Sequence, residues 1–303
     1  MNNHGINYKL PKVTLLNESG LGTAEYAART CYDSFASSEN ESIAKLDLTL
    51  RKNVSVENSK SVASEISHIH DIQDSELLRN LAWVHHHHSI LEHASLTFLI
   101  QGTSRGVLQE HARHRIQSIS VRSTRYTMSS LINAFVASLS SALKLTRAER
   151  LEEFIEIYKA DIKNMDFLVV SDAEYIKLEL TSIWSKLHYQ RLTIGYDEFI
   201  KLSVAKSSLN IVKFQNEASP IDIYRKLQAG KNKRNVGDPF KHIVSDNWKV
   251  DMVVTFNIRS LKNYFHLRDS GAAWFQIQWL AKAMKEVTPN KYLKLIDKNF
   301  KEN

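Results

Sequence analysis

The chain has a single cysteine, Cys31, among its 303 residues, so it cannot form an internal disulfide bond. Cys31 follows a run of small residues in which Ala24, Ala28, Cys31 and Phe35 would share one face of a helix. We therefore expect a small buried side chain at this position rather than a nucleophile.

Long apolar runs are also missing. No run approaches the roughly 18 residues that a membrane span needs, and the N-terminal residues MNNHGINYKLPK contain no apolar signal core. We therefore expect a cytoplasmic protein with no membrane partner. With 43% apolar and 24% charged residues, the composition is ordinary for a globular chain long enough to bury a core.

Positive charge exceeds negative charge: the net charge is +7 and the pI is near 9.2. This excess favours an anionic ligand such as a nucleotide, or a nucleic acid. A nucleic-acid-binding protein is therefore one alternative, which the basic stretch KNKRN at 231–235 also suggests. The chain shows no recognisable binding fold of that kind, and aromatic residues do not interleave its basic cluster. We expect no nucleic-acid partner.

Histidines cluster in the first half of the chain and suggest a metal-dependent hydrolase as a second alternative. The residues concerned are His85 to His88, with His68, His70, Asp71, His93, His111 and His114. Adjacent histidines on a helix point in different directions, and the chain has neither an H-E-x-x-H motif nor a cysteine pair. We therefore predict no metal site.

Hydrophobic periodicity predicts a core of sheet and helices that comes from the first and last thirds of the chain. Strands are expected over 94–101 and 250–256, with an extended segment over 119–127. Helices are expected over 21–36, 74–87 with Asp74 as N-cap, 104–111, 260–266 and 272–287. Residues 37–73 are polar and give no clear pattern. Capping-box patterns predict a helical insertion over 132–232 within a single domain spanning 1–303.

The segment ARHRIQSISVRSTRYT, residues 112–127, contains four arginines and no carboxylate. Arginine presents a planar fork of donors that matches phosphate and carboxylate groups, and it stays charged. A solvated basic surface would have the same composition, but the spacing of Arg113-His114-Arg115 and Ser123 forms a defined motif. We interpret the segment as an anion-binding site. Ser123 is expected to hold a substrate rather than attack it, because no base is identifiable nearby.

This segment resembles the signature of the flavin-dependent thymidylate synthases, the ThyX family, which is R-H-R, seven residues, then S. Two further blocks support the resemblance. Residues 88–93, HSILEH, are similar to the family's H-x-x-x-x-E-H segment, and residues 257–268, NIRSLKNYFHLR, are similar to its N-x-R-S-L-x-N-F-x-x-L-R block. The resemblance covers residues 20–130 and 235–290, whereas the middle of the chain does not match.

The resemblance implies an enzyme that makes dTMP from dUMP by reductive methylation. FAD is then reduced by NADPH, and methylenetetrahydrofolate supplies the one-carbon unit. It also implies an α/β (α+β) fold with a mixed sheet flanked by helices, and a homotetramer whose active sites are shared between subunits. Arg268 matches the arginine thought to stabilise ionisation at N3 of the uracil, and it is therefore the expected catalytic residue.

The same match gives the residues expected at each part of the site. For FAD they are His88, Ile90, Arg113, His114, Arg115, Val121, Asn257, Ile258, Arg259 and Asn263. For dUMP they are Glu110, His111, Ala112, Arg113, Val121, Arg122, Ser123, Thr124, Arg125, Lys241 and Arg268.

Some positions depart from the family's usual pattern. Glu110 stands where many members have Gln, Val121 where many have Glu, Ser245 where Pro is common, and Tyr264 where Phe is usual. The change at 121 removes a carboxylate that could accept a hydrogen bond in the site. These replacements bear on the detail of the site rather than on the resemblance.

Overall fold

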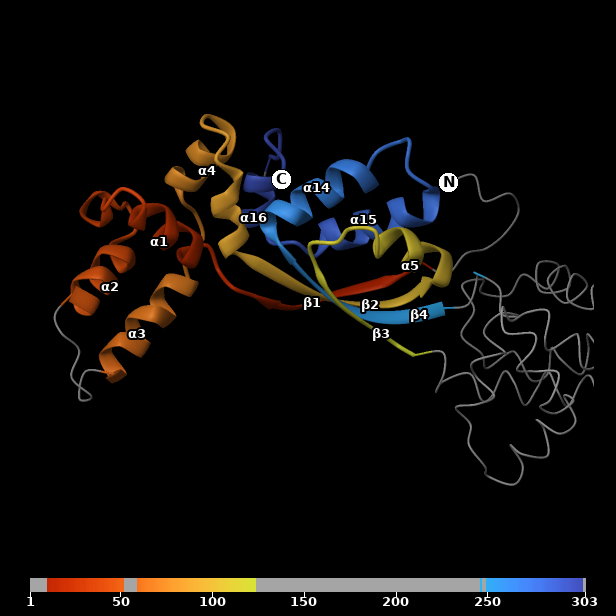
Figure 1. Cartoon of the computed structure of the whole chain (residues 1–303), viewed down its shortest axis with the longest axis horizontal. Helices are drawn as coiled ribbons and strands as arrows, with labels where there is room; N and C mark the ends of the chain where they lie inside the picture. The colour runs from red at the N-terminus through yellow and green to blue at the C-terminus, as the bar shows by residue number, and fades with distance from the viewer. Residues whose placement is uncertain (1–9, 52–58, 124–245, 247–248, 302–303) are drawn as a thin grey trace, which may run out of the picture. The chain divides into compact units, whose positions relative to one another are not determined.

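The computed structural model describes residues 10–51, 59–123, 246 and 249–301. The chain divides into two compact units. One comprises Leu10–Thr103, Val107–Val121 and Asp251–Asn303, and it holds most of the sheet and helices of Figure 1. The other comprises Met1–Lys9, Ser104–Gly106 and Arg122–Val250, most of which lies outside the described residues. The predicted insertion over 132–232 falls there, as does the predicted extended segment beyond 123.

A four-stranded sheet has the strand order β1-β2-β4-β3. Its strands are β1 (Lys12–Glu18), β2 (Ser95–Ser104), β3 (Ser118–Val121) and β4 (Lys249–Asn257). Strand β1 runs antiparallel to β2, and β3 runs antiparallel to β4. Strands β2 and β4 are antiparallel as well, because Thr97 and Thr255 share a hydroxyl hydrogen bond of 2.9 Å while the Gly102 amide donates to Asp251 Oδ1 at 2.8 Å.

Alternation of apolar residues decides which face of the sheet is buried. In β4 the side chains of Val250, Met252, Val254 and Phe256 are all buried, and the residues between them are partly exposed. The predicted strand over 250–256 is therefore confirmed. Strand β2 alternates in the same way, with Leu96, Phe98 and Ile100 buried. A period of two places these side chains on one face, where helices can cover them.

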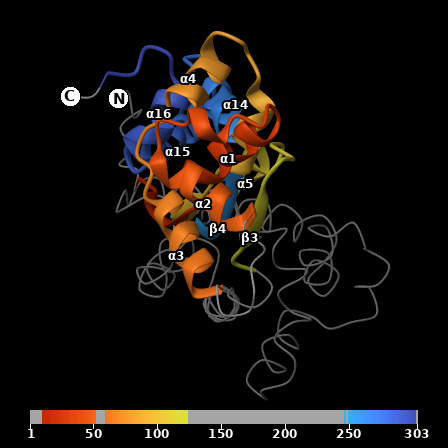
Figure 2. The same cartoon turned by 90° about the vertical axis from the view of Figure 1, so that its left-hand side faces the viewer.

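The described helices lie on one side of this sheet and beyond one end of it (Figure 1). They are α1 (Gly22–Thr30), α2 (Glu41–Arg51), α3 (Ser59–His70), α4 (Glu76–Trp83), α5 (Arg105–His111), α14 (Ile258–Arg268), α15 (Phe275–Glu286) and α16 (Asn290–Ile296). Short 3₁₀ helices span Phe35–Ser37 and His88–His93. Helices α14, α15 and α16 lie on the same side of the sheet (Figure 1), and α1, α2 and α3 pack against one another (Figure 2). No described helix is long and apolar enough to cross a membrane.

Three expectations from the sequence differ from the structure. Cys31 is exposed rather than buried, because α1 ends at Thr30 and Cys31 occupies its C-cap, beyond the buried face that Ala24 and Ala28 form. The helix after residue 73 is capped by Ser75, whose hydroxyl accepts from the Leu78 amide at 3.3 Å, while Asp74 pairs with Arg79. That helix also ends at Trp83, four residues short of the predicted end.

The polar stretch 37–73 contains helices α2 and α3, which the sequence did not predict. Only a few apolar side chains anchor them, including Ile43, Leu46, Ile69 and Ile72, which are buried in the core. Most helical stability in proteins comes from such tertiary packing rather than from local propensity. The two helices are therefore expected to depend on packing against each other, against α1 and against the 3₁₀ turn at Phe35–Ser37.

Candidate functional site

Helix α14 begins directly after the core strand β4, and Asn257 is its N-cap. The Asn257 Oδ1 atom accepts a hydrogen bond from the Ser260 amide at 2.8 Å. The helix therefore starts at Ile258, two residues before the predicted start, because an asparagine N-cap satisfies an otherwise unpaired amide. Ile258 is buried, and its amide donates to the Ala94 carbonyl at 2.9 Å. These bonds fix the orientation of α14 on the sheet.

The first half of α14 lies beside the 3₁₀ helix His88–His93. Arg259 Nη1 and Glu92 Oε1 form an ion pair at 2.5 Å, in which both side chains are about half exposed (53% and 46%). Asn263 is exposed one turn further along the helix. Two sequence blocks more than 160 residues apart therefore meet here. The sequence did not predict Glu92 as a site residue, although it lies within the recognised segment.

His88 opens the 3₁₀ helix and is half-buried, as is Ile90. Burial, followed by the nearby Lys262, lowers the pKa of His88. Its Nδ1 atom is buried and has no hydrogen-bond partner among the described residues. Lys262 itself lies over the Trp83 ring, with Nζ 3.5 Å from the ring centroid, and burial lowers its pKa. His88 therefore presents a neutral ring beside a group of cations.

The Arg113-His114-Arg115 motif forms a turn at the end of α5. The Arg113 amide donates to the Glu110 carbonyl at 3.3 Å, and the His114 amide donates to the His111 carbonyl at 3.1 Å. This turn leaves Ala112, Arg113 and Arg115 exposed, whereas His114 is half-buried. The two arginines of the motif therefore offer their donors to solvent or a ligand, and the histidine between them faces the protein.

His111 is fully buried at the end of α5. Its Nδ1 atom shares a hydrogen bond of 3.0 Å with the hydroxyl of Tyr264, and its ring packs edge-on against Tyr264 and Phe256. Burial, followed by the neighbouring His114, lowers the pKa of His111 to about 3. Burial also raises the pKa of the Tyr264 phenol. Both groups are therefore neutral, and their bond joins α5 to α14.

Arg268, the last residue of α14, reaches back to α5 and to the turn that follows it. Its Nε donates to His114 Nε2 at 2.9 Å, and its Nη1 donates to Glu110 Oε2 at 3.0 Å. A third bond runs from Nη2 to the Glu110 carbonyl at 3.5 Å. Burial, then Arg268, lowers the pKa of His114 to about 4, so this histidine is neutral and can accept. The bond assigns its proton to Nδ1.

The remaining predicted residues lie at the end of the described segment or beyond it. Val121 ends strand β3 and is half-buried, Arg122 is half-buried and Ser123 is exposed. Thr124, Arg125 and Lys241 lie outside the described residues. The structure thus brings together the residues of α5, the following turn, α14 and the 3₁₀ helix His88–His93, and leaves the three others without a described position.

We expect the folded state to lose stability as the pH falls below the ordinary histidine pKa of 6.5. The pKa of His111 is about 3 in the folded chain, so only the unfolded chain takes up a proton between these values. This contribution to stability is complete above pH 6.5 and falls by about 1.4 kcal/mol per pH unit below it. His114 acts in the same direction with less weight, because solvent reaches its side chain.

Urea unfolding measured from pH 7 down to about pH 4.5 checks this expectation, with a loss of about 2.5 kcal/mol from His111 alone. The variant His111→Gln removes the buried titrating group and should show a flatter dependence on pH. His68→Gln changes an exposed histidine of α3 and should keep the wild-type slope. A wild-type protein equally stable across this range would contradict the assignment.

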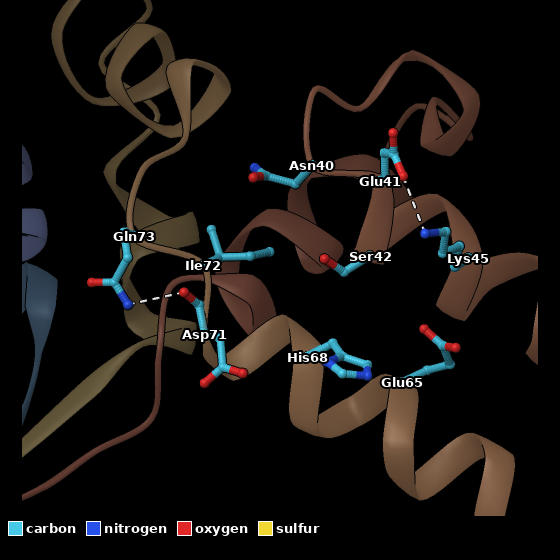
Figure 3. A pocket seen from close by; sticks show the side chains of 9 residues that line it. All are labelled: Asn40, Glu41, Ser42, Lys45, Glu65, His68, Asp71, Ile72 and Gln73. Atoms are coloured by element: carbon cyan, nitrogen blue, oxygen red, sulfur yellow. Dashed lines mark hydrogen bonds and ion pairs between the residues drawn. The ribbon is translucent and has the colours of Figure 1, made fainter.

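A separate pocket lies between α2 and α3, and side chains of both helices face one another across it (Figure 3). Glu41 and Lys45 form an ion pair of 3.1 Å at this pocket, and Gln73 Nε2 donates to the Asp71 carbonyl at 2.9 Å. It contains none of the predicted site residues. The described part of the chain also has no group of three histidine, cysteine or acidic residues placed to hold a metal ion. The lining residues are Asn40, Glu41, Ser42, Lys45, Glu65, His68, Asp71, Ile72 and Gln73.

Comparisons with known proteins match most of the chain. The family model described as "Thymidylate synthase complementing protein" matches residues 14–291. The flavin-dependent thymidylate synthase of Wolinella succinogenes is 28% identical over 280 residues, which is 92% of this chain and 94% of that protein. That of Campylobacter jejuni (strain RM1221) is 27% identical over 281 residues, with 93% of both chains covered.

A solved structure gives the same result at the level of the fold. The flavin-dependent thymidylate synthase ThyX of Helicobacter pylori, complexed with FAD and dUMP, is similar with a TM-score of 0.51 and 25% identity. The similarity covers 96% of this chain and 100% of that one.

Proposed function

The chain belongs to the family of thymidylate synthase complementing proteins, and we propose that it is a flavin-dependent thymidylate synthase. As such it uses FAD to make dTMP from dUMP. The relatives that cover more than nine-tenths of this chain carry that activity in their names. The solved relative, which was complexed with FAD and dUMP, supports the same cofactor and substrate.

One structural observation supports this proposal most strongly: a single helix, α14, contacts both of the other recognised sequence blocks. Near its start, Arg259 pairs with Glu92 of the 3₁₀ helix His88–His93. At its end, Arg268 binds Glu110 and His114 of the arginine-rich segment. Helix α14 thus joins segments that are separated by more than 150 residues in the sequence.

Exposed side chains of these segments fit FAD. Its pyrophosphate needs charged donors, and the exposed Arg113, Arg115 and Arg259 supply guanidinium groups that bind phosphate oxygens in pairs. Asn263 adds an exposed amide, and the buried Nδ1 atom of His88 has no partner among the described residues. We propose that these residues, with Ile90, His114, Val121, Asn257 and Ile258, hold the cofactor. FAD then supplies the hydride chemistry, while the protein binds and orients.

The dUMP site is proposed to include residues from both ends of the arginine-rich segment 112–127. Arg113, Arg122, Ser123 and Arg125 are suited to the phosphate, since guanidinium and hydroxyl groups bind its oxygens. We include Glu110, His111, Ala112, Val121, Thr124 and Lys241 from the same match. Arg268 would donate to the uracil where negative charge develops, and a fixed donor at that point lowers the barrier to attack from C5.

The proposed reaction also needs a reductant and a one-carbon donor. NADPH would reduce the flavin, and methylenetetrahydrofolate would supply the one-carbon unit. We also propose a cytoplasmic homotetramer with shared active sites, and one catalytic domain over 1–303 in which residues 132–232 are an insertion. Segment 112–127 supplies arginine donors for anions, and the proposed catalysis is carried out by a cofactor.

Purified wild-type protein tests the proposal directly. We expect the visible absorbance of oxidised flavin, and conversion of labelled dUMP to dTMP that requires both NADPH and methylenetetrahydrofolate. Reactions that lack one of these compounds are the controls. Protein that carries zinc and no flavin, or that binds random DNA with a steep dependence on salt and makes no dTMP, would contradict it.

A further inference from the structure

Three bonds anchor the guanidinium of Arg268. Nε donates to His114, Nη1 donates to the Glu110 carboxylate, and Nη2 donates to the Glu110 carbonyl. An arginine side chain has five N–H donors in a rigid planar arrangement. These bonds therefore leave at most two donors for a substrate, and the plane that carries them is already fixed.

The Glu110 carboxylate is the strongest of these anchors. Its contact with Arg268 is a charge-assisted hydrogen bond of 3.0 Å, and a bond to an ionised acceptor is stronger than one between neutral partners. The two side chains are only 20% (Arg268) and 36% (Glu110) exposed. Screening by solvent is therefore weaker here than in the pair of Lys45 and Glu41, whose side chains are 62% and 84% exposed.

Glu110 is itself held rigidly against α14. It precedes His111, which is fully buried and bonded to the Tyr264 hydroxyl. The His114 ring packs edge-on against the same tyrosine, with centroids 4.7 Å apart. Both acceptors of Arg268 therefore sit on segments that Tyr264 ties to the helix from which Arg268 extends. Such a supported arrangement is what a precisely oriented catalytic group requires.

We propose that Glu110 is a positioning residue, whose carboxylate oxygen orients the Arg268 guanidinium for its action on the uracil. This role rests on the proposed function, and it needs an oxygen acceptor at this point rather than a negative charge. Glutamine, which many members of the family carry here, presents an acceptor of the same kind. Glu110 and the usual glutamine would therefore both orient the arginine through a side-chain oxygen.

Steady-state kinetics of two variants of the flavin-loaded enzyme test this role. Glu110→Ala removes the acceptor and should lower kcat by about 10- to 100-fold, since a small misplacement of a catalytic group has an effect of that order. The KM for dUMP and the flavin content should change by less than about threefold, because the Glu110 side chain then acts on the substrate through Arg268, and an interaction made only in the transition state affects kcat. Glu110→Gln should restore kcat to within about threefold of wild type.

Glu41→Ala is the matched control, because it removes an acidic partner from an exposed ion pair on α2 and should leave all three quantities unchanged. Wild-type kcat in Glu110→Ala would overturn the role of Glu110 while the proposed function stands. The role would also be overturned if Glu110→Gln lost as much kcat as Glu110→Ala. A rise in the KM of Glu110→Ala with kcat unchanged would overturn it as well. Wild-type protein that makes no dTMP would overturn the proposed function and this role with it.

Discussion

Replacing Arg268 by alanine is expected to lower kcat for dUMP methylation by about 100- to 1,000-fold, the usual effect of removing one preorganised donor at a site of developing charge. The variant should still bind FAD, because Arg113, Arg115 and Arg259 are unchanged and exposed. Turnover of labelled dUMP, together with the flavin absorbance of the same preparation, measures both quantities.

The expectation rests on the geometry of the guanidinium. His114 and Glu110 fix its plane, and burial keeps His114 neutral so that it accepts a hydrogen bond rather than repels a cation. Arg268→Lys keeps the charge but has a single nitrogen, which cannot bind both partners as the planar fork does. We therefore expect an intermediate loss in the lysine variant.

Arg79→Ala is a suitable control, because it removes an arginine from a surface pair with Asp74 on α4. It should leave both kcat and flavin content unchanged. If Arg268→Ala methylates dUMP at the wild-type rate, the catalytic assignment of Arg268 is wrong. If it fails to retain FAD, Arg268 belongs to the cofactor site instead.

The fold could be predicted from the sequence where periodicity is strong. Val250, Met252, Val254 and Phe256 alternate without interruption, and β4 is confirmed as a core strand. The family's block at 257–268 likewise coincides with α14. Helices α2 and α3 escaped prediction because their apolar residues do not mark a single buried face, Leu48, Leu50 and Ile66 being exposed, and because their stability depends on neighbours that local sequence does not show.

The candidate site, like the fold, could be predicted from the sequence only in part. Sequence identified Glu110, His114 and Arg268 one by one, through their places in separate motifs. It did not predict that the first two bind the third, because they lie 158 and 154 residues away along the chain. It also missed Lys262 and Tyr264 as part of this region. The tyrosine was visible only as a departure from the usual phenylalanine, and its partner His111 lies on another helix.

Tyr264 supports the second large expected effect. Its side chain is fully buried, and its ring packs against His111, His114, Phe256 and Phe265. Tyr264→Ala should lower the free energy of unfolding by about 3–5 kcal/mol, as truncation of a buried aromatic residue does. It should also lower turnover, because the segment that carries Glu110 and His114 loses its support.

The milder Tyr264→Phe separates packing from hydrogen bonding. Although phenylalanine is the usual family residue here, we expect it to destabilise this chain by about 1–3 kcal/mol, because His111 Nδ1 would be left buried without its partner. Urea unfolding at fixed protein and FAD concentrations measures both variants, since a bound ligand shifts apparent stability. Tyr32→Phe, at a position 70% exposed, should stay within about 0.5 kcal/mol of wild type.

The double variant Tyr264→Phe with His111→Phe decides whether the hydroxyl acts through this bond. If it does, removing both polar partners should cost less than the sum of the two single changes, because no buried polar atom is then left unpaired. Strict additivity would mean that the hydroxyl and the imidazole contribute independently. In that case Tyr264 would hold α5 in place by the packing of its ring alone.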